Sequence, residues 1–146
     1  MKNKDSLSKE VLKNKILEVI KGHKLAALAT VASGKPWVRL LMCRSQGLNL
    51  YICTYKDSRK VAQIKKNPNV HLVIGKDINK LEAPFVQVAG KAKIRSDAKI
   101  RNKLWRDFMK KYYSGPDDPN YVIIEVKPKL IEYRSTETEN FQVYRN

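Results

Sequence analysis

Three short apolar segments that follow one another with only tight turns between them constrain the fold most. They span residues 25–31, 37–44 and 48–54, and the first of them is rich in small and β-branched side chains. The residues between them, 33–36 and 46–47, are turn-forming sequences that contain glycine. Parallel neighbours need a crossover of a dozen or more residues, which these turns are too short to provide. The sequence therefore predicts an antiparallel meander rather than βαβ units.

Three more strands are expected further along the chain, at 70–74, 85–94 and 121–126, with Pro128 interrupting the last one. A total of 146 residues suits one domain, 1–146, with a modest core. Six strands with few helices in a domain of this size favour a mainly β fold. We expect a small closed or nearly closed antiparallel barrel with helices packed outside.

Three helices are expected around this barrel. The first, at about 8–21, is capped by Ser6 or Ser8, and its buried side holds Val11, Leu12, Ile16, Val19 and Ile20. A short second helix covers 59–66 and stops before Pro68. The third, at 97–113, has one apolar face made of Ile100, Leu104, Trp105, Phe108 and Tyr112. The polar tail from about residue 135 is expected to be loose.

The cysteines and histidines predict neither a disulfide nor a metal site. If residues 46–47 form a two-residue turn, Cys43 faces Leu50 rather than Cys53. His23 and His71 are isolated, and no metal-ligand spacing links them to the cysteines. The polar N-terminus lacks a signal peptide, and no apolar stretch reaches the roughly 20 residues that span a bilayer. We therefore expect a cytoplasmic protein without a membrane partner.

The net charge of +16, from 30 Lys and Arg against 14 Asp and Glu, points to a phosphate-bearing partner. A dense basic stretch between residues 91 and 111 fits nonspecific binding to a nucleic-acid backbone. No recognised nucleic-acid motif accompanies it, and a solvated helix face explains the same charges. Nucleic acid is therefore an alternative partner, and charge alone does not choose between it and a nucleotide cofactor.

The segment 54–60 has the pattern of a phosphate site. A strand ends at Thr54, a short loop follows, and a helix begins at Ser58 with Arg59 and Lys60 in its first turn. Cations are poorly placed at a helix start, where unpaired N–H groups and the positive end of the dipole already favour an anion. A bound phosphate would resolve that conflict, whereas a solvated helix end with incidental charges is the alternative interpretation.

Two arginines flank the apolar run 40–43 within the second strand. Arg39 and Arg44 lie on opposite faces by strand alternation, so at most one of them points into the barrel. An arginine directed toward a core is costly unless it is paired. A phosphate or a flavin carbonyl would pair with it, while Arg44, beside the turn, can also reach water.

These segments together resemble the pyridoxamine 5′-phosphate oxidase-like superfamily. The strand 39–44 is similar to the family's Arg-x-x-Leu-Leu-Lys strand, and 54–70 is similar to its Thr-x-x-x-Ser-(Arg/x)-Lys helix start and Asn-Pro-x-Val exit. The segment 88–92 resembles a strand with a Gly-x-Ala ending. Leu104-Trp105, residues 113–122 and residues 131–133 are similar to the general-stress-protein subgroup.

The resemblance implies a six-stranded antiparallel split barrel of the FMN-binding type. It implies a homodimer with one FMN in each of two interfacial clefts. By position it places Arg39, Ser58, Arg59 and Lys60 at the FMN phosphate. The same resemblance assigns the flavin ring to Leu40, Leu41, Met42, Cys53 and Thr54. It sets Arg44 on the substrate side of the ring, and Trp105 of a second subunit over it.

The function that the resemblance implies is an FMN-dependent oxidoreductase acting on a small molecule or NAD(P)H. Phe85 stands where true pyridoxamine-phosphate oxidases have a glutamine, and Arg134 where the subgroup usually has tryptophan. Oxidation of vitamin B6 is therefore not expected. Deazaflavin or heme in place of FMN, and a non-catalytic flavin or heme carrier, are the alternatives. No residue pattern points to a catalytic side chain.

Overall fold

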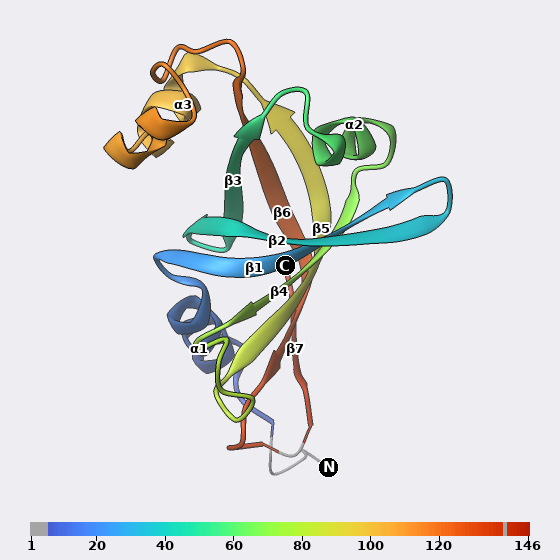
Figure 1. Cartoon of the computed structure of the whole chain (residues 1–146). Coiled ribbons are helices and arrows are strands. Elements are labelled where there is room, and N and C mark those ends of the chain that lie inside the picture. Colours follow the sequence, from blue (N-terminus) through green and yellow to red (C-terminus); the bar gives the residue numbers. More distant parts are fainter. Residues whose placement is uncertain (1–5, 139) are drawn as a thin grey trace.

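Six antiparallel strands close into a barrel in the computed structural model, which describes residues 6–138 and 140–146 (Figure 1). Their order around the barrel is β3-β2-β1-β4-β5-β6, and β6 pairs back onto β3. A further strand, β7 (Gln142–Arg145), adds to β6 outside the barrel. The six strands are β1 (His23–Ala32), β2 (Lys35–Gln46), β3 (Asn49–Tyr55), β4 (Asn69–Gly75), β5 (Phe85–Arg95) and β6 (Tyr121–Arg134). The predicted fold class is confirmed.

Two tight hairpins build the meander β1-β2-β3. Ser33 and Gly34 both have positive φ, as a two-residue turn with the twist of the flanking strands requires. The second turn lies at residues 47–48 rather than 46–47, because β2 continues to Gln46. Leu50 consequently pairs with Ser45, and its predicted pairing with Cys43 was wrong. The conclusion drawn from it stands, since both cysteines are free.

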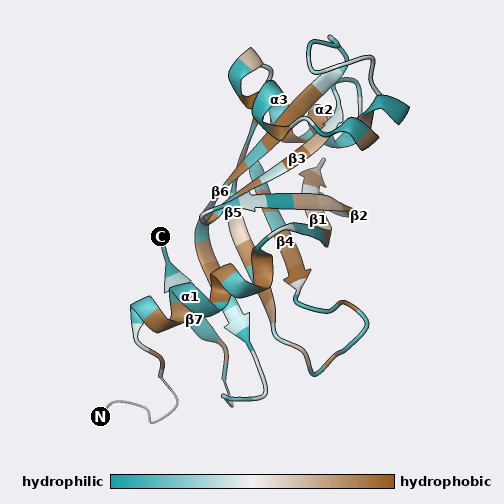
Figure 2. Cartoon of the chain, turned by 90° about the vertical axis from the view of Figure 1, so that its left-hand side faces the viewer, coloured by the Kyte–Doolittle hydropathy of each residue, from teal (hydrophilic) through white to brown (hydrophobic). Residues whose placement is uncertain are grey.

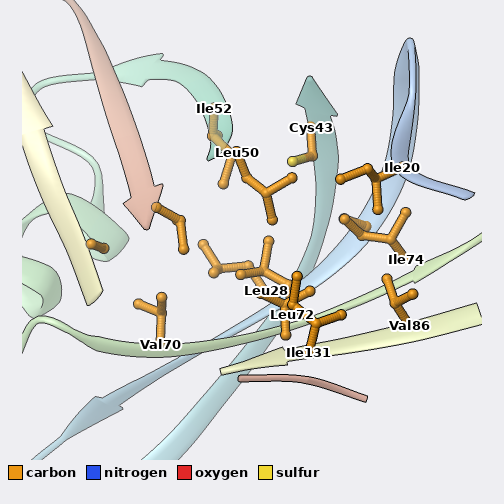
Figure 3. Packing of buried hydrophobic residues seen from close by; sticks show 14 of the residues in the cluster. Ile20, Leu28, Cys43, Leu50, Ile52, Val70, Leu72, Ile74, Val86 and Ile131 are labelled. Carbon is orange, nitrogen blue, oxygen red and sulfur yellow. The ribbon is translucent and has the colours of Figure 1, made fainter. Parts of the chain in front are cut away.

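The barrel interior is filled by alternate side chains of every strand, as Figure 3 shows for Leu28, Leu50, Leu72 and Val86. Two helices, α1 (Lys9–Ile20) and α2 (Arg59–Lys66), pack near the two ends of the barrel (Figures 1 and 2). α1 packs against β4, β5 and β7, and α2 against β1 and β5. No helix in the described part of the chain is long and apolar enough to cross a bilayer.

The N-terminal helix matches its prediction closely. Ser8 is its N-cap, and its side chain accepts a hydrogen bond from the Val11 amide at 3.3 Å. The predicted apolar side is buried except for Val11, which is 44% exposed. Val11 lies one position before Leu12, so it is turned away from the face that packs on the barrel.

The predicted helix 97–113 is two separate pieces. α3 (Ala98–Leu104), capped by Asp97, is followed by a 3₁₀ helix, η1 (Asp107–Lys111), with Trp105 and Arg106 extended between them. The break lets the Trp105 ring pack edge-on against Tyr121, with the centroids 5.7 Å apart. The same break leaves the two aromatic residues at 108 and 112 exposed, contrary to the predicted apolar face.

Two expectations about the C-terminal part were also wrong. β6 runs through Pro128, which sits opposite Gly90 at a register shift, where a missing N–H is tolerated. The tail is not loose over 142–145, because β7 pairs with β6 and Tyr144 is buried in the core. Gln142 also accepts a hydrogen bond from the Leu7 amide at 3.1 Å.

Candidate flavin-binding site

A cavity of about 410 Å³ opens between β2, β3, the start of α2 and the α3–η1 segment. Its size is within the range of small-molecule sites, and most of its wall is apolar or aromatic. Polar groups lie at its two ends, Thr54 and Lys60 at one and His23 and Arg44 at the other. The cavity is lined by His23, Leu41, Met42, Cys43, Arg44, Tyr51, Ile52, Cys53, Thr54, Tyr55, Lys60, Leu104, Phe108, Met109, Tyr112 and Tyr113.

The first turn of α2 offers an anion site, and the nearest carboxylate in the sequence is that of Asp57, one residue before the N-cap. Ser58 is the N-cap, but its hydroxyl makes no capping hydrogen bond, and its Oγ is buried without any partner. The first turn holds Arg59 and Lys60 and no acidic residue. A buried hydroxyl that lacks a partner costs about 1–3 kcal/mol. A phosphate oxygen could satisfy this hydroxyl and the free N–H groups of the helix start together.

Arg39 is held in place by two buried polar side chains. Its Nη1 donates to Thr30 Oγ1 at 2.8 Å, and its Nη2 donates to Gln63 Oε1 at 3.0 Å. Thr30 Oγ1 in turn donates to Gln63 Oε1. Thr30 is completely buried and Gln63 is 8% exposed. The guanidinium is therefore fixed in orientation by neutral groups, which leave its charge uncompensated.

The three cations at this end of the site act on one another. Burial and the neighbouring Arg59 lower the pKa of Arg39, while burial and Arg39 lower the pKa of Lys60. Arg59 itself lies over the Trp37 ring, 5.4 Å from the centroid. No carboxylate of the described residues forms an ion pair with any of the three. The cluster thus favours a dianion such as a phosphate monoester.

A second cationic group lies at the other end of the cavity. Arg44 pairs with Tyr51, three residues before Thr54 on β3, which places the two ends about 10 Å apart along the strand. The Nη1 of Arg44 is 3.5 Å from His23 Nε2. Burial, Arg44 and Arg106 lower the pKa of His23, which favours the neutral form of its imidazole.

The donor set at the α2 end fits the phosphate of a nucleotide cofactor, and the apolar middle of the cavity fits a planar ring. The family model for pyridoxamine 5′-phosphate oxidase matches residues 12–135. The chain belongs to the pyridoxamine 5′-phosphate oxidase family.

General stress protein 26 of Bacillus subtilis (strain 168) is 39% identical over 125 residues, covering 86% of this chain and 89% of that protein. The crystal structure of General Stress Protein 26 from Bacillus anthracis str. Sterne is 34% identical, with a TM-score of 0.80, and the match covers 92% of this chain and 98% of that one. A protein related to general stress protein 26 from Clostridium acetobutylicum is 22% identical, with a TM-score of 0.73, over 95% and 96% of the two chains. That last likeness shows the fold alone.

The structure gathers most of the residues that family resemblance assigned to a cofactor, but not all in one cavity. Six of them line it: Leu41, Met42, Arg44, Cys53, Thr54 and Lys60. Arg39, Ser58 and Arg59 surround the start of α2 beside it, with Arg59 in a neighbouring hollow. Leu40 lies on the outer face of β2 and is 62% exposed. Trp105 packs inside its own chain against Tyr121, and its predicted role in a partner's site stays a prediction.

Sequence reasoning missed the residues that orient Arg39 and those that form the aromatic wall. Gln63 had a usable signal, since it lies between buried Val61 and Ile64 on the short second helix. A polar residue on a buried helix face calls for a partner. His23, which the sequence presented only as an isolated histidine, lines the cavity. The described residues contain no group of three or more side chains suited to hold a metal ion.

Proposed function

We propose that this member of the pyridoxamine 5′-phosphate oxidase family binds FMN and acts as a flavin-dependent oxidoreductase on a small molecule or NAD(P)H. One observation carries the proposal. Three cations that form no ion pair with a carboxylate of the described residues, Arg39, Arg59 and Lys60, cluster at the helix whose N-cap hydroxyl, that of Ser58, is buried without a partner among those residues. Such a set of groups is stabilised by a phosphate and is difficult to explain without one.

The chain's own residues would then bind and orient the cofactor. The α2 end would hold the phosphate through charge-assisted hydrogen bonds, with Thr54 adding a hydroxyl donor. Leu41, Met42 and Cys53 would line the flavin ring and exclude water from one side. Arg44, at the far end of the cavity, would hold a substrate near the ring. FMN, when bound, supplies the electron-transfer chemistry, and the protein contributes orientation and electrostatics.

We further propose a homodimer, with the exposed face of β2 as its contact. Val38 and Leu40 point outward from this strand and are 68% and 62% exposed, and Met42, 52% exposed, lies where this face meets the cavity. Val73, in the same sheet, is also exposed. Single exposed hydrophobic residues are ordinary, but a row of them along one strand marks an interaction site. A second copy of the chain fits, because this face runs beside the cavity that the resemblance places at an interface.

Other cofactors have support from fold alone. A solved structure named F420 reductase is 22% identical with a TM-score of 0.62, and a heme binding protein from Mycobacterium smegmatis is 13% identical with a TM-score of 0.72. The cluster at the start of α2 favours FMN over heme, because heme carries no phosphate. Deazaflavin and heme are the alternatives, and the absorption spectrum of the bound cofactor distinguishes them from FMN.

The first test is the visible absorption spectrum of the purified protein, with mass spectrometry of the group that denaturation releases. A flavin spectrum with the mass of FMN supports the proposal. A heme or deazaflavin spectrum, or a protein that neither contains nor takes up FMN, contradicts it.

A variant pair tests where the phosphate binds. Arg59→Ala with Lys60→Ala should weaken FMN binding at least tenfold while the protein stays folded. The matched control, Lys65→Ala with Lys66→Ala, removes the same charge from the last turn of the same helix and should bind FMN as the parent does. Equal affinity in the two double variants would overturn the assignment of the phosphate.

A further inference from the structure

Four lysines form a basic face on the outside of the barrel, away from the candidate flavin-binding site. Lys91 and Lys93 point outward from β5, and Lys127 and Lys129 from β6; all four are exposed. None of them lines the cavity between β2 and β3. The basic stretch noticed in the sequence contained only the first two, and the pairing of β5 with β6 adds the others.

The lysines of this basic face repel one another. Lys91 and Lys127 are directly opposite in the antiparallel pair, where side chains on the same face come within about 5 Å at Cβ. Like charges in that arrangement are destabilising. On the other side Lys91 pairs with Asn69, which carries no charge to offset it.

Nearby carboxylates do not neutralise the basic face. Glu125 is opposite Lys93, but it is only 5% exposed and already accepts a hydrogen bond from Arg95 at 2.6 Å. Lys65 and Lys66 end α2 close by, because the Pro68 carbonyl bonds to the Ala92 amide at 2.8 Å. None of these lysines takes part in an ion pair among the described residues.

We infer that the basic face binds the sugar–phosphate backbone of a nucleic acid, independently of base sequence. The lysines lie on the convex exterior of two adjacent strands, where an extended polyanion can contact several at once. Binding would relieve the repulsion between Lys91 and Lys127 and release counterions from the nucleic acid. An anionic membrane is a poorer match, because membrane-surface binding combines cations with apolar anchors. No exposed large hydrophobic side chain of the described residues belongs to the segments 91–95 and 121–130.

The test measures binding of a fluorescein-labelled 20-base-pair DNA duplex, and of one of its single strands, by fluorescence anisotropy between 50 and 200 mM salt, on protein with and without added FMN. We expect dissociation constants of about 10⁻⁴–10⁻⁶ M that weaken steeply with salt. Lys91→Gln with Lys127→Gln should lower the slope of log K against log salt for the duplex by about 1.8, since each phosphate contact contributes about 0.9. Added FMN should leave the slope unchanged.

The matched control is Lys13→Gln with Lys80→Gln, which removes two exposed charges outside the basic face, one on α1 and one in the loop between β4 and β5. It should retain the parent's slope. Equal losses in the two double variants would show that binding follows net charge alone, and would overturn the inference. So would the absence of binding at 50 mM salt, or binding to phosphatidylserine vesicles but not to either oligonucleotide. Thermal melting checks the fold, and the Lys91/Lys127 variant should be at least as stable as the parent.

Discussion

Substitutions of Gln63 can separate an effect on the stability of the protein from an effect on its affinity for the cofactor. Its side-chain oxygen accepts hydrogen bonds from both Arg39 and Thr30, and it is almost completely buried. Gln63→Met keeps the length of the side chain and removes this acceptor. The bond to the charged guanidinium contributes about 1.5–3 kcal/mol, and the bond from the hydroxyl about 1 kcal/mol. Arg39 is half-buried and can recruit water, so the lower end applies to it.

We therefore expect Gln63→Met to lower the free energy of unfolding by about 2–3 kcal/mol. For a chain of this length the melting temperature should fall by roughly 4–12 °C. Urea unfolding followed by tryptophan fluorescence measures the change. Gln87→Met is the control, since Gln87 faces outward on β5 and makes no side-chain hydrogen bond among the described residues. A loss within about 0.5 kcal/mol of the control would refute the network's importance.

Gln63→Glu tests the same contact in the opposite sense. A carboxylate still accepts both hydrogen bonds and adds an ion pair with Arg39, so stability at pH 7 should equal or exceed that of the parent. It also neutralises part of the cluster at the start of α2, so FMN affinity should fall at least tenfold, or about 1.4 kcal/mol. Flavin fluorescence quenching measures that affinity. Unchanged affinity would show that the cluster does not hold the phosphate.

Three further predictions concern other parts of the molecule. Leu40→Lys should weaken the proposed dimer by about 2 kcal/mol or more, which is roughly a thirtyfold rise in its dissociation constant. Light scattering measures the mass of the particle in solution. An unchanged mass at low micromolar protein counts against the β2 contact. Arg106→Gln should raise the pKa of His23, because the substitution removes one of the positive charges that lower this pKa. An NMR titration of the imidazole that shows no upward shift contradicts the prediction. Gly90→Ala should destabilise the barrel by about 1–3 kcal/mol, since a Cβ there would lie 2.7 Å from a backbone carbonyl oxygen of β6. Gly75→Ala is the control in the same urea assay, because a Cβ at that position would have no neighbouring atom closer than 3.8 Å.

Local signals predicted the parts of the fold that depend on neighbouring residues. Alternation and turn residues were enough for the six strands, and Ser8 and Asp97 mark two helix starts. The failures came where tertiary packing overrides local preference. The hydrophobic period of 97–113 continues past Trp105, but α3 ends at Leu104, and the Trp105 ring packs on Tyr121, a residue that no local pattern relates to it. Pro128 looked like a strand end, and only the register shift opposite Gly90 shows why the strand continues.

The candidate site divides in the same way. Thr54, Ser58, Arg59 and Lys60 lie within one contiguous segment, so the sequence alone predicted their phosphate-binding pattern. Thr30, on β1, meets its partners only when the barrel forms, and no local pattern marks it. The aromatic wall of the cavity likewise comes from the segment after α3, which is distant in sequence from β2 and β3.

The closing pair of the barrel has a consequence for how the chain acquires its fold. β3 ends at Tyr55 and its partner β6 begins at Tyr121, so this pairing joins segments more than sixty residues apart. Contacts of such long range slow folding, because much of the loop entropy is lost before the contact forms. As the chain leaves the ribosome, the open edge of β3 has no partner until β6 has been made. Proper assembly therefore depends on protecting that edge from other chains for the time that translation of residues 56–126 takes, at roughly 5–20 residues per second.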